Sequence, residues 1–301
     1  MSPLNLRLVA NHCVFRGLTS PAPETSNINV NSIPDVRSDD VIDTEQLLTS
    51  TFLRRAEWFD ETGSTNDLAL QWAGDPTIAT PCLIGATRQQ AGRGRGANRW
   101  YGSDGTLMFS VLFDMTALKI TQHLWPQFSL VTGLSVAETL EVFLPQTAVG
   151  VKWPNDVWLN GRKVCGILIE QPDRMPGRLV AGLGWNVNTS FTSAPDDIRS
   201  IATSMRDASG STFDAADVLR CFLQRWEANL TQLADGSFDL DARWTRFCVL
   251  RDRRIRVSAT EPECEGTCLG IAADGALLVS DGHQSRRYYA GTVRLVESQI
   301  V

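Results

Sequence analysis

The sequence has few of the residues on which many enzyme classes depend. Its 301 residues include only three histidines, His12, His123 and His283, which are far apart in the chain. A histidine-dependent hydrolase or metalloenzyme is therefore not expected. The seven cysteines form no C-x-x-C pair, and Cys264 and Cys268 have neither a second pair nor histidines nearby. No zinc site is expected either.

Long hydrophobic runs and an excess of positive charge are also missing. No apolar stretch is long enough to span a membrane and no secretory signal is evident, so reduced thiols in a cytoplasmic protein are the simplest interpretation. The net charge of −6 argues against a general nucleic-acid binder, which would usually carry a basic face. With 43% apolar residues, the chain can bury one large core and a smaller satellite domain.

Residues 88–100, RQQAGRGRGANRW, stand out because they place three glycines and three arginines within eight positions. Glycine allows close approach of the backbone to a ligand, and each arginine offers a fork of donors that matches carboxylate or phosphate oxygens. Such a segment can also be a flexible linker. Here it lies between two runs of strand character, 82–87 and 106–113, so both ends are fixed. We expect an anion-binding loop.

The same segment fits the loose dinucleotide-binding pattern Gly92-x-Gly94-x-x-Ala97. That pattern requires a strand that runs directly into a helix, whereas residues 98–105 are turn-like and lead into a strand. The Rossmann interpretation therefore fails, and no G-x-x-x-x-G-K-[ST] phosphate loop occurs.

The first 50 residues show no sustained periodicity and are rich in Ser, Thr, Asn and Pro, which predicts a disordered tail. Arg7 and Arg16 among apolar positions also weakly fit a transit peptide. The segment leaves no room for a helix-turn-helix module. From about residue 51, a turn enters a helix at 61–70, where Ser64 or Thr65 can act as the cap or as part of a polar binding edge.

The rest of the chain predicts a mixed α+β core followed by a small β domain. Helices are expected at 121–144 and 215–230, and a hairpin is expected around the Asn160-Gly161 turn, with a further strand at 178–187. Beyond residue 250, short strands are expected at 255–257, 266–271, 276–279 and 292–296. This pattern divides the chain into a tail at 1–50, a catalytic domain at 51–249 and a small barrel at 250–301.

A second unusual segment ends an apolar strand with a cation, an amide and a carboxylate: Lys152-Trp153-Pro154-Asn155-Asp156. An ordinary strand-to-turn transition would explain part of it. The following hairpin returns Lys163 and Gly166 toward the same side, so two lysines, an amide and an acid can converge. Convergent polar groups beside an apolar sheet are typical of a small-molecule site.

Taken together, these motifs resemble those of the biotin protein ligases, also called holocarboxylase synthetases, over roughly residues 57–296. The resemblance rests on STN at 64–66, Gln89 with GRGRG at 92–96, KWPND at 152–156, K-x-x-GILIE at 163–170 and GLGWNVN at 182–188. It implies a class II synthetase-like catalytic domain with a mixed sheet and a C-terminal SH3-like barrel. The form without an N-terminal DNA-binding domain fits best.

The resemblance also implies an activity. Members of the family form biotinyl-5′-AMP from biotin and ATP with Mg²⁺, and then transfer biotin to a lysine of a biotin carboxyl carrier domain. Biotin is the substrate, no membrane or DNA partner is implied, and both a monomer and a homodimer remain open. The physiological acceptor carboxylase is not identified by the sequence.

The resemblance also implies a role for each residue of this chain that matches a motif of the family. Those implied for biotin binding are Ser64, Thr65, Asn66, Gln89, Arg93, Gly94, Arg95, Lys163 and Gly166. Those implied for the nucleotide are Lys152, Asn155, Asp156, Asn186 and Trp100. Arg95, Lys163 and Asp156 are the expected catalytic residues, because adenylation concentrates charge that cationic donors stabilise and the acceptor lysine must lose a proton. No protein metal cluster is expected, since Mg²⁺ arrives with ATP.

The loop departs from the GRGRRGR-x-W pattern of some bacterial members, because Gly96, Ala97 and Asn98 replace further arginine-bearing positions. Three alternatives stay open at this stage: a lipoate or octanoate ligase or transferase, a non-catalytic nucleic-acid binder that uses the RGRG segment, and a transcriptional biotin sensor.

Overall fold

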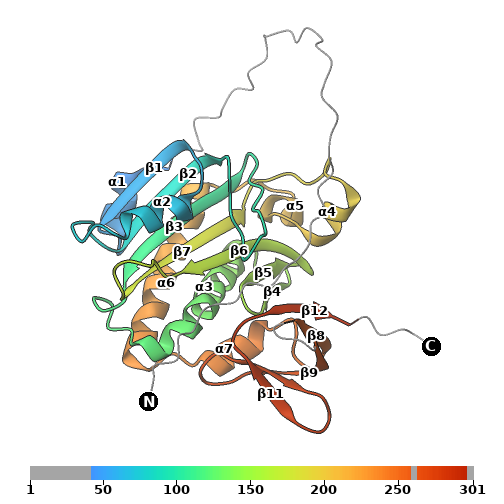
Figure 1. Cartoon of the computed structure of the whole chain (residues 1–301). Helices are drawn as coiled ribbons and strands as arrows, with labels where there is room; N and C mark the ends of the chain where they lie inside the picture. Colours follow the sequence, from blue (N-terminus) through green and yellow to red (C-terminus); the bar gives the residue numbers. More distant parts are fainter. Residues whose placement is uncertain (1–41, 259–262, 297–301) are drawn as a thin grey trace.

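The computed structural model describes residues 42–258 and 263–296. A seven-stranded mixed sheet forms its centre, in the order β1-β2-β3-β7-β6-β5-β4 (Figure 1). Its strands are β1 (Arg55–Thr62), β2 (Cys82–Gln89), β3 (Thr106–Asp114), β4 (Val149–Lys152), β5 (Asp156–Leu159), β6 (Arg162–Glu170) and β7 (Arg178–Asn186). Only β1 and β2 pair in parallel. A parallel pair needs a crossover, and helix α2 (Thr65–Trp72) supplies it.

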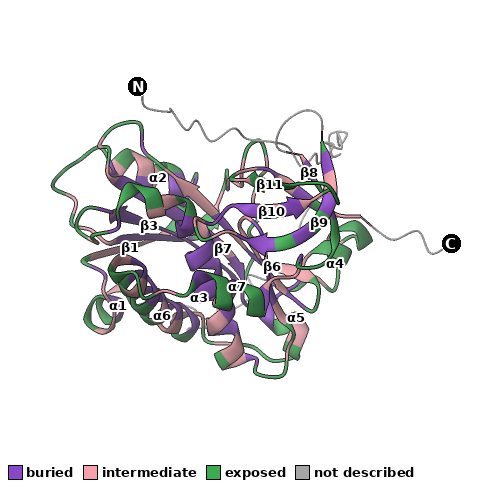
Figure 2. Ribbon diagram, turned by 90° about the horizontal axis from the view of Figure 1, so that it is seen from below, coloured by how far each residue is buried: buried purple, intermediate pink, exposed green. Residues whose placement is uncertain are grey.

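Helices cover both faces of this sheet, as expected for strands that are apolar on both sides. Alternate residues of β2 separate the two faces: Leu83 joins the main core, whereas Cys82 and Ile84 pack under α2. The main core contains the long helices α3 (Phe128–Phe143) and α6 (Ala215–Asp235), with α1 (Thr44–Ser50) beside them (Figure 2). The result is a three-layer arrangement in which the sheet is buried.

An aromatic cluster fills the space between the sheet and α6. The ring centroids of Phe113 and Trp226 are 5.0 Å apart, and those of Phe222 and Trp226 are also 5.0 Å apart. Rings at these separations stabilise beyond the area that they bury. The predicted helix at 215–230 is confirmed and extends to Asp235, where Gly236 ends it with φ 78°.

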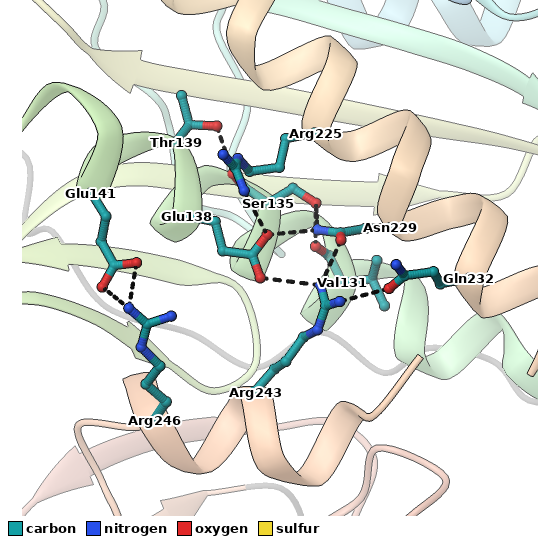
Figure 3. Close-up of polar contacts among 10 residues, drawn as sticks. All are labelled: Val131, Ser135, Glu138, Thr139, Glu141, Arg225, Asn229, Gln232, Arg243 and Arg246. Atoms are coloured by element: carbon teal, nitrogen blue, oxygen red, sulfur yellow. Dashed lines mark hydrogen bonds and ion pairs between the residues drawn. The ribbon is translucent and has the colours of Figure 1, made fainter. Parts of the chain in front are cut away.

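A polar network joins α7 (Leu240–Phe247) to the two long helices (Figure 3). The Glu138 carboxylate of α3 accepts hydrogen bonds from Asn229 Nδ2 at 3.0 Å and from Arg243 Nη1 at 3.2 Å. Glu141 pairs with Arg246 at 2.6 Å. Because α7 leads directly into the C-terminal strands, this network fixes where the second sheet starts.

The second sheet is antiparallel, with five strands in the order β11-β10-β9-β8-β12. They are β8 (Arg254–Ser258), β9 (Cys264–Ile271), β10 (Leu277–Ser280), β11 (Ser285–Tyr288) and β12 (Thr292–Leu295). The sheet is consistent with the expected SH3-like domain. The strand β11 was not predicted, because its residues are mostly exposed and polar and so show no apolar alternation.

Several local predictions are confirmed. The Asn160-Gly161 turn joins β5 and β6, with φ values of 48° and 76° that fit the turn type favoured by this dipeptide. The helix expected at 121–144 begins as a 3-10 helix (Gln122–Gln127) and becomes α3 at Phe128. The short helices α4 (Asp196–Ile201) and α5 (Met205–Ser209) were not predicted.

The predicted boundary of the disordered tail differs from the structure. Residues 1–41 lie outside the described part of the chain, but residues 44–50 form α1 rather than an irregular segment. Asp43 caps this helix by accepting hydrogen bonds from the amides of Glu45 and Gln46. With seven residues and only Leu47 buried, α1 has too few apolar positions to show a period. In the described ranges, no helix combines the length and apolar character needed to cross a bilayer.

Candidate active site

A cavity of about 560 Å³ lies where the GRGR loop, the N-terminus of α2 and the strands β4 to β7 meet. All the predicted site residues line this one cavity. They come from five separate sequence motifs that span residues 64 to 186. The fold therefore brings together the groups that the sequence predicted to act together.

One end of the cavity is lined by uncharged polar side chains from α2 and β2, with the charged Arg93–Glu170 pair beside them. Ser64 is the N-cap of α2, but its side chain makes no capping hydrogen bond. Instead, Gln89 at the end of β2 reaches across, and its Oε1 accepts from the Thr65 amide at 2.8 Å. Ser64, Thr65 and Asn66 are only 3–4% exposed. The N-terminus of α2 is thus capped by a side chain of β2 rather than by Ser64, whose hydroxyl is left at the cavity wall.

Ser110 of β3 organises the same end of the cavity from below. Its hydroxyl lies 2.8 Å from Thr65 Oγ1 and 2.5 Å from Asn66 Oδ1, and it is fully buried. The Asn66 side chain also occupies the space above Gly182, where an added Cβ would lie 1.9 Å from Asn66 Oδ1. Glycine is therefore required at 182 for this asparagine to stay in place.

The GRGR segment forms a narrow hairpin over the cavity. The Trp100 amide donates to the Gly92 carbonyl at 3.0 Å, and the Gly94 amide donates to the Asn98 carbonyl at 2.8 Å. Gly96 takes a positive φ of 63° at the tip. The segment enters from β2 and leaves toward β3, which confirms that it is not a strand-to-helix phosphate loop.

The two arginines of the hairpin have different partners. The Arg93 guanidinium forms hydrogen bonds to Glu170 at 3.1 and 2.5 Å and an ion pair with Asp67 at 2.8 Å. Arg95 instead donates to Asn155 Oδ1 and to the Gly291 carbonyl, both at 3.3 Å. Burial lowers the pKa of the Arg95 guanidinium, and Asp156 partly offsets this effect. Arg95 therefore differs from Arg93 in having no carboxylate bound directly to it.

The other end of the cavity is charged. Lys163 Nζ and Asp156 Oδ1 are 2.6 Å apart, because β5 and β6 pair with Asp156 opposite Gly166. Asn155 donates from Nδ2 to the Ile167 carbonyl at 2.7 Å, which fixes its amide. Lys152 stacks over the Trp158 ring at 5.1 Å. Two lysines, an amide and an acid do converge here, as expected from the hairpin.

Trp100 lies on the floor between these two ends. Its ring covers Gly166 and Gly184, where added Cβ atoms would lie 3.1 and 2.2 Å from it. Lys163 Nζ is 5.7 Å from the ring centroid. The structure thus places Trp100 beside Lys163, and its predicted proximity to adenine stays a prediction. Asn186 is buried and donates to the Thr203 carbonyl at 3.1 Å.

Several residues in or behind the cavity wall were not predicted as site residues. Ser110 and Glu170 support the predicted residues from behind, and Gly291 belongs to the C-terminal segment. The end of α4 lines the cavity beside Lys163, through Ile198, Ser200, Ile201 and Ala202. Glu170 ends the GILIE motif and so had a sequence signal. Ser110 is a lone hydroxyl in an apolar strand, and Gly291 is 196 residues away from Arg95, so neither had one.

The cavity does not contain a protein metal centre. Within residues 42–258 and 263–296, no group of three or more His, Cys, Asp or Glu residues is placed to hold a metal ion. The hard oxygen ligands at the charged end are Asp156 and Asn155. Such a set suits a Mg²⁺ ion that is held mainly by phosphate groups.

Comparisons with known proteins agree with this geometry. Residues 58–188 match the Biotin/lipoate A/B protein ligase family. The chain is 30% identical over 248 residues to the biotin–[acetyl-CoA-carboxylase] ligase of Mycobacterium tuberculosis, covering 80% of this chain and 88% of that protein. It is 29% identical over 220 residues to the bifunctional ligase/repressor BirA of Bacillus spizizenii. That match covers 71% of this chain and 66% of the relative's length, which is just under two thirds.

A structural comparison gives the same result. The biotin protein ligase from Aquifex aeolicus, solved in complex with biotin and ATP, aligns with a TM-score of 0.71 and 27% identity. The alignment covers 81% of this chain and 100% of that one. The chain belongs to the Biotin/lipoate A/B protein ligase family, within its biotin protein ligases.

Proposed function

We propose that this chain is an ATP-dependent ligase that forms biotinyl-5′-AMP and transfers the biotinyl group to a lysine of a biotin carboxyl carrier domain. The observation that carries the proposal is that a buried, neutral polar end and a cationic end face the same cavity. The first suits a ring with an uncharged ureido group. The second suits a carboxylate that reacts with a phosphate.

In the first step, a biotin carboxylate oxygen attacks the α-phosphorus of ATP, and pyrophosphate leaves. Both reactants are negatively charged, so the reaction needs cations held in place before it starts. Arg95 and Lys163 supply them from the loop and from β6. Partial burial of Arg95 strengthens its interaction with an anion, because fewer water molecules screen it.

In the second step, the acceptor lysine attacks the carbonyl carbon of the adenylate, and AMP leaves. The attacking amine must be neutral, so its ammonium form loses a proton first. Asp156 is the proposed acceptor of that proton or the group that positions the amine. Asp156 becomes available once Lys163 turns from it toward the phosphate.

Mg²⁺ enters with ATP in this proposal and neutralises phosphate charge. Asp156 and the Asn155 amide oxygen are the groups that would hold the ion. Lys152 and Asn186 would contact the nucleotide. The catalytic unit comprises residues 51–249, extended by α1, and Gly291, which precedes β12 of the small C-terminal sheet, closes one wall of the cavity. The six cysteines in the described ranges are all unpaired, which supports a reducing compartment such as the cytoplasm.

The decisive experiment incubates the protein with MgATP, biotin and an apo carrier domain, and measures the intact mass of the carrier. A gain of one biotinyl group at a single lysine is expected, together with release of pyrophosphate. Lipoate and octanoate replace biotin in parallel reactions. Transfer of lipoate instead of biotin, or no transfer, would contradict the proposal.

A further inference from the structure

Glu170, the last residue of β6, connects three separate parts of the buried end. Its Oε2 accepts from Asn66 Nδ2 at 2.8 Å, and its two oxygens accept from Arg93 at 3.1 and 2.5 Å. Its side chain is 25% exposed. One carboxylate therefore fixes α2 and the GRGR hairpin on the same strand, across 104 and 77 residues of sequence.

The Arg93 guanidinium is surrounded by two protein carboxylates: it donates hydrogen bonds to Glu170 and forms an ion pair, without hydrogen-bond geometry, with Asp67. Its two terminal nitrogens face Glu170, and its Nε pairs with Asp67 in the first turn of α2. A ligand carboxylate would have to displace one of these partners before it could bind Arg93. Charge-assisted pairs of this geometry are about twice as strong as neutral hydrogen bonds. The Arg93 side chain thus holds the hairpin, whereas Arg95 remains available to a ligand.

The Asn66 amide is oriented by the same carboxylate. Its Oδ1 accepts from Ser110 at 2.5 Å, and its Nδ2 donates to Glu170 and, at 3.4 Å, to the Leu168 carbonyl. Without Glu170, the amide would lose its best acceptor in a buried position, which carries an energetic cost. Its orientation would then be less well defined.

We propose that Glu170 is a positioning residue that clamps the GRGR hairpin and Asn66 around the biotin end. This inference rests on the proposed function for its consequence, whereas the clamp itself can be measured without any ligand. Loss of the clamp should raise the KM for biotin and speed the escape of the adenylate. The KM for ATP should change little, because the cationic end has other supports.

The test uses Glu170→Gln and Glu170→Ala in the full chain. Glu170→Gln keeps the size and one acceptor but places an amide where the carboxylate faces Arg93. Glu61→Gln is the matched control: Glu61 also bridges two side chains, Arg88 of β2 at 3.3 Å and Gln90 at 2.7 Å, but neither of them is a side chain that Glu170 holds.

Two measurements are made on each variant. Hydrogen exchange of residues 92–100 without ligands should be faster in both Glu170 variants and unchanged in Glu61→Gln. The KM for biotin should rise by about 10-fold or more, as for loss of a hydrogen bond to a charged group, with the KM for ATP within about twofold. The double variant Arg93→Ala/Glu170→Ala should be less impaired than the sum of the two single effects, because each single change already removes the Arg93–Glu170 pair.

The outcomes separate the clamp from the proposed function. Unchanged exchange of the hairpin in Glu170→Gln overturns the clamp, whatever the enzyme does. Faster exchange with an unchanged KM for biotin overturns its role in ligand binding. If the unmodified protein transfers no biotin, the proposed function fails, and the exchange data alone decide the clamp.

Discussion

The two ends of the cavity are built in different ways. At the neutral end, Thr65 and Asn66 are 4% exposed; the Thr65 amide donates to Gln89 Oε1, and Asn66 Oδ1 accepts from Ser110. At the charged end, the Lys163 and Asp156 side chains are 33% and 22% exposed and hold each other in an ion pair. The first arrangement is rigid because its polar groups are satisfied within the protein. The second can exchange partners.

This difference matches the two tasks of a ligase that activates a carboxylate. Recognition of a ring requires fixed donors and acceptors, since a buried polar group left unpaired rejects the wrong ligand. Activation requires cations that follow charge as it moves from carboxylate to phosphate. The ion pair of Lys163 and Asp156 keeps both groups in place until a phosphate competes for the lysine.

The largest effect is expected from Lys163→Ala. Loss of one preorganised cation should lower the rate of adenylate formation by about 10²–10³-fold, with a much smaller change in biotin affinity. Pyrophosphate release measures the rate, and calorimetry measures biotin binding. Lys163→Arg, which keeps the charge, should recover part of the rate. An equal loss of biotin affinity would show that the two ends are not separate.

Arg95→Ala should produce a smaller loss, because Lys163 remains. We expect adenylate formation to slow by roughly 10–100-fold, or the intermediate to escape before transfer. Filtration of a reaction without carrier domain would detect free adenylate. Arg99→Ala is a suitable control, since Arg99 lies in the same hairpin, where its backbone pairs with Arg93. An unchanged rate with full retention would rule out the role of Arg95.

Two glycines of β7 allow the ends to be perturbed separately. An alanine at 182 would place Cβ 1.9 Å from Asn66 Oδ1, whereas an alanine at 184 would place it 2.2 Å from the Trp100 ring. Gly182→Ala should raise the KM for biotin by about 10-fold, the value of one lost charged or buried hydrogen bond. Gly184→Ala should mainly displace Trp100 and increase adenylate escape.

Steady-state kinetics and the filtration assay distinguish these two results. Gly133→Ala on α3 is the control, because its Cβ would meet Ile167 only at an ordinary 3.6 Å. If Gly182→Ala and Gly184→Ala gave the same kinetic profile, the floor of the cavity would act as one unit rather than two.

The sequence predicted which residues meet, but not what holds them. Strand ends, a Gly/Arg loop and the Asn160-Gly161 turn are local signals, and they were sufficient to place Lys163 and Asp156 together. Ser110 and Gly291 depend on which strands are neighbours in space, because β3 lies beside β7 and Gly291 reaches Arg95 only in the folded chain. Likewise, α1 and β11 bury too little to show a period.

A change of ionic strength should have the smallest effect, and it compares the two ends of the cavity without any substitution. Exposed charges are screened over about 10 Å at 0.1 M salt, whereas buried neutral hydrogen bonds are not. Raising the salt from about 0.05 to 0.5 M should therefore raise the KM for ATP several-fold and leave the KM for biotin within about twofold. Arg95→Ala should show a shallower dependence for ATP, because one of the screened charges is gone. A parallel rise of both KM values would mean that charge, rather than the buried hydrogen bonds of Asn66 and Thr65, governs binding at the neutral end as well.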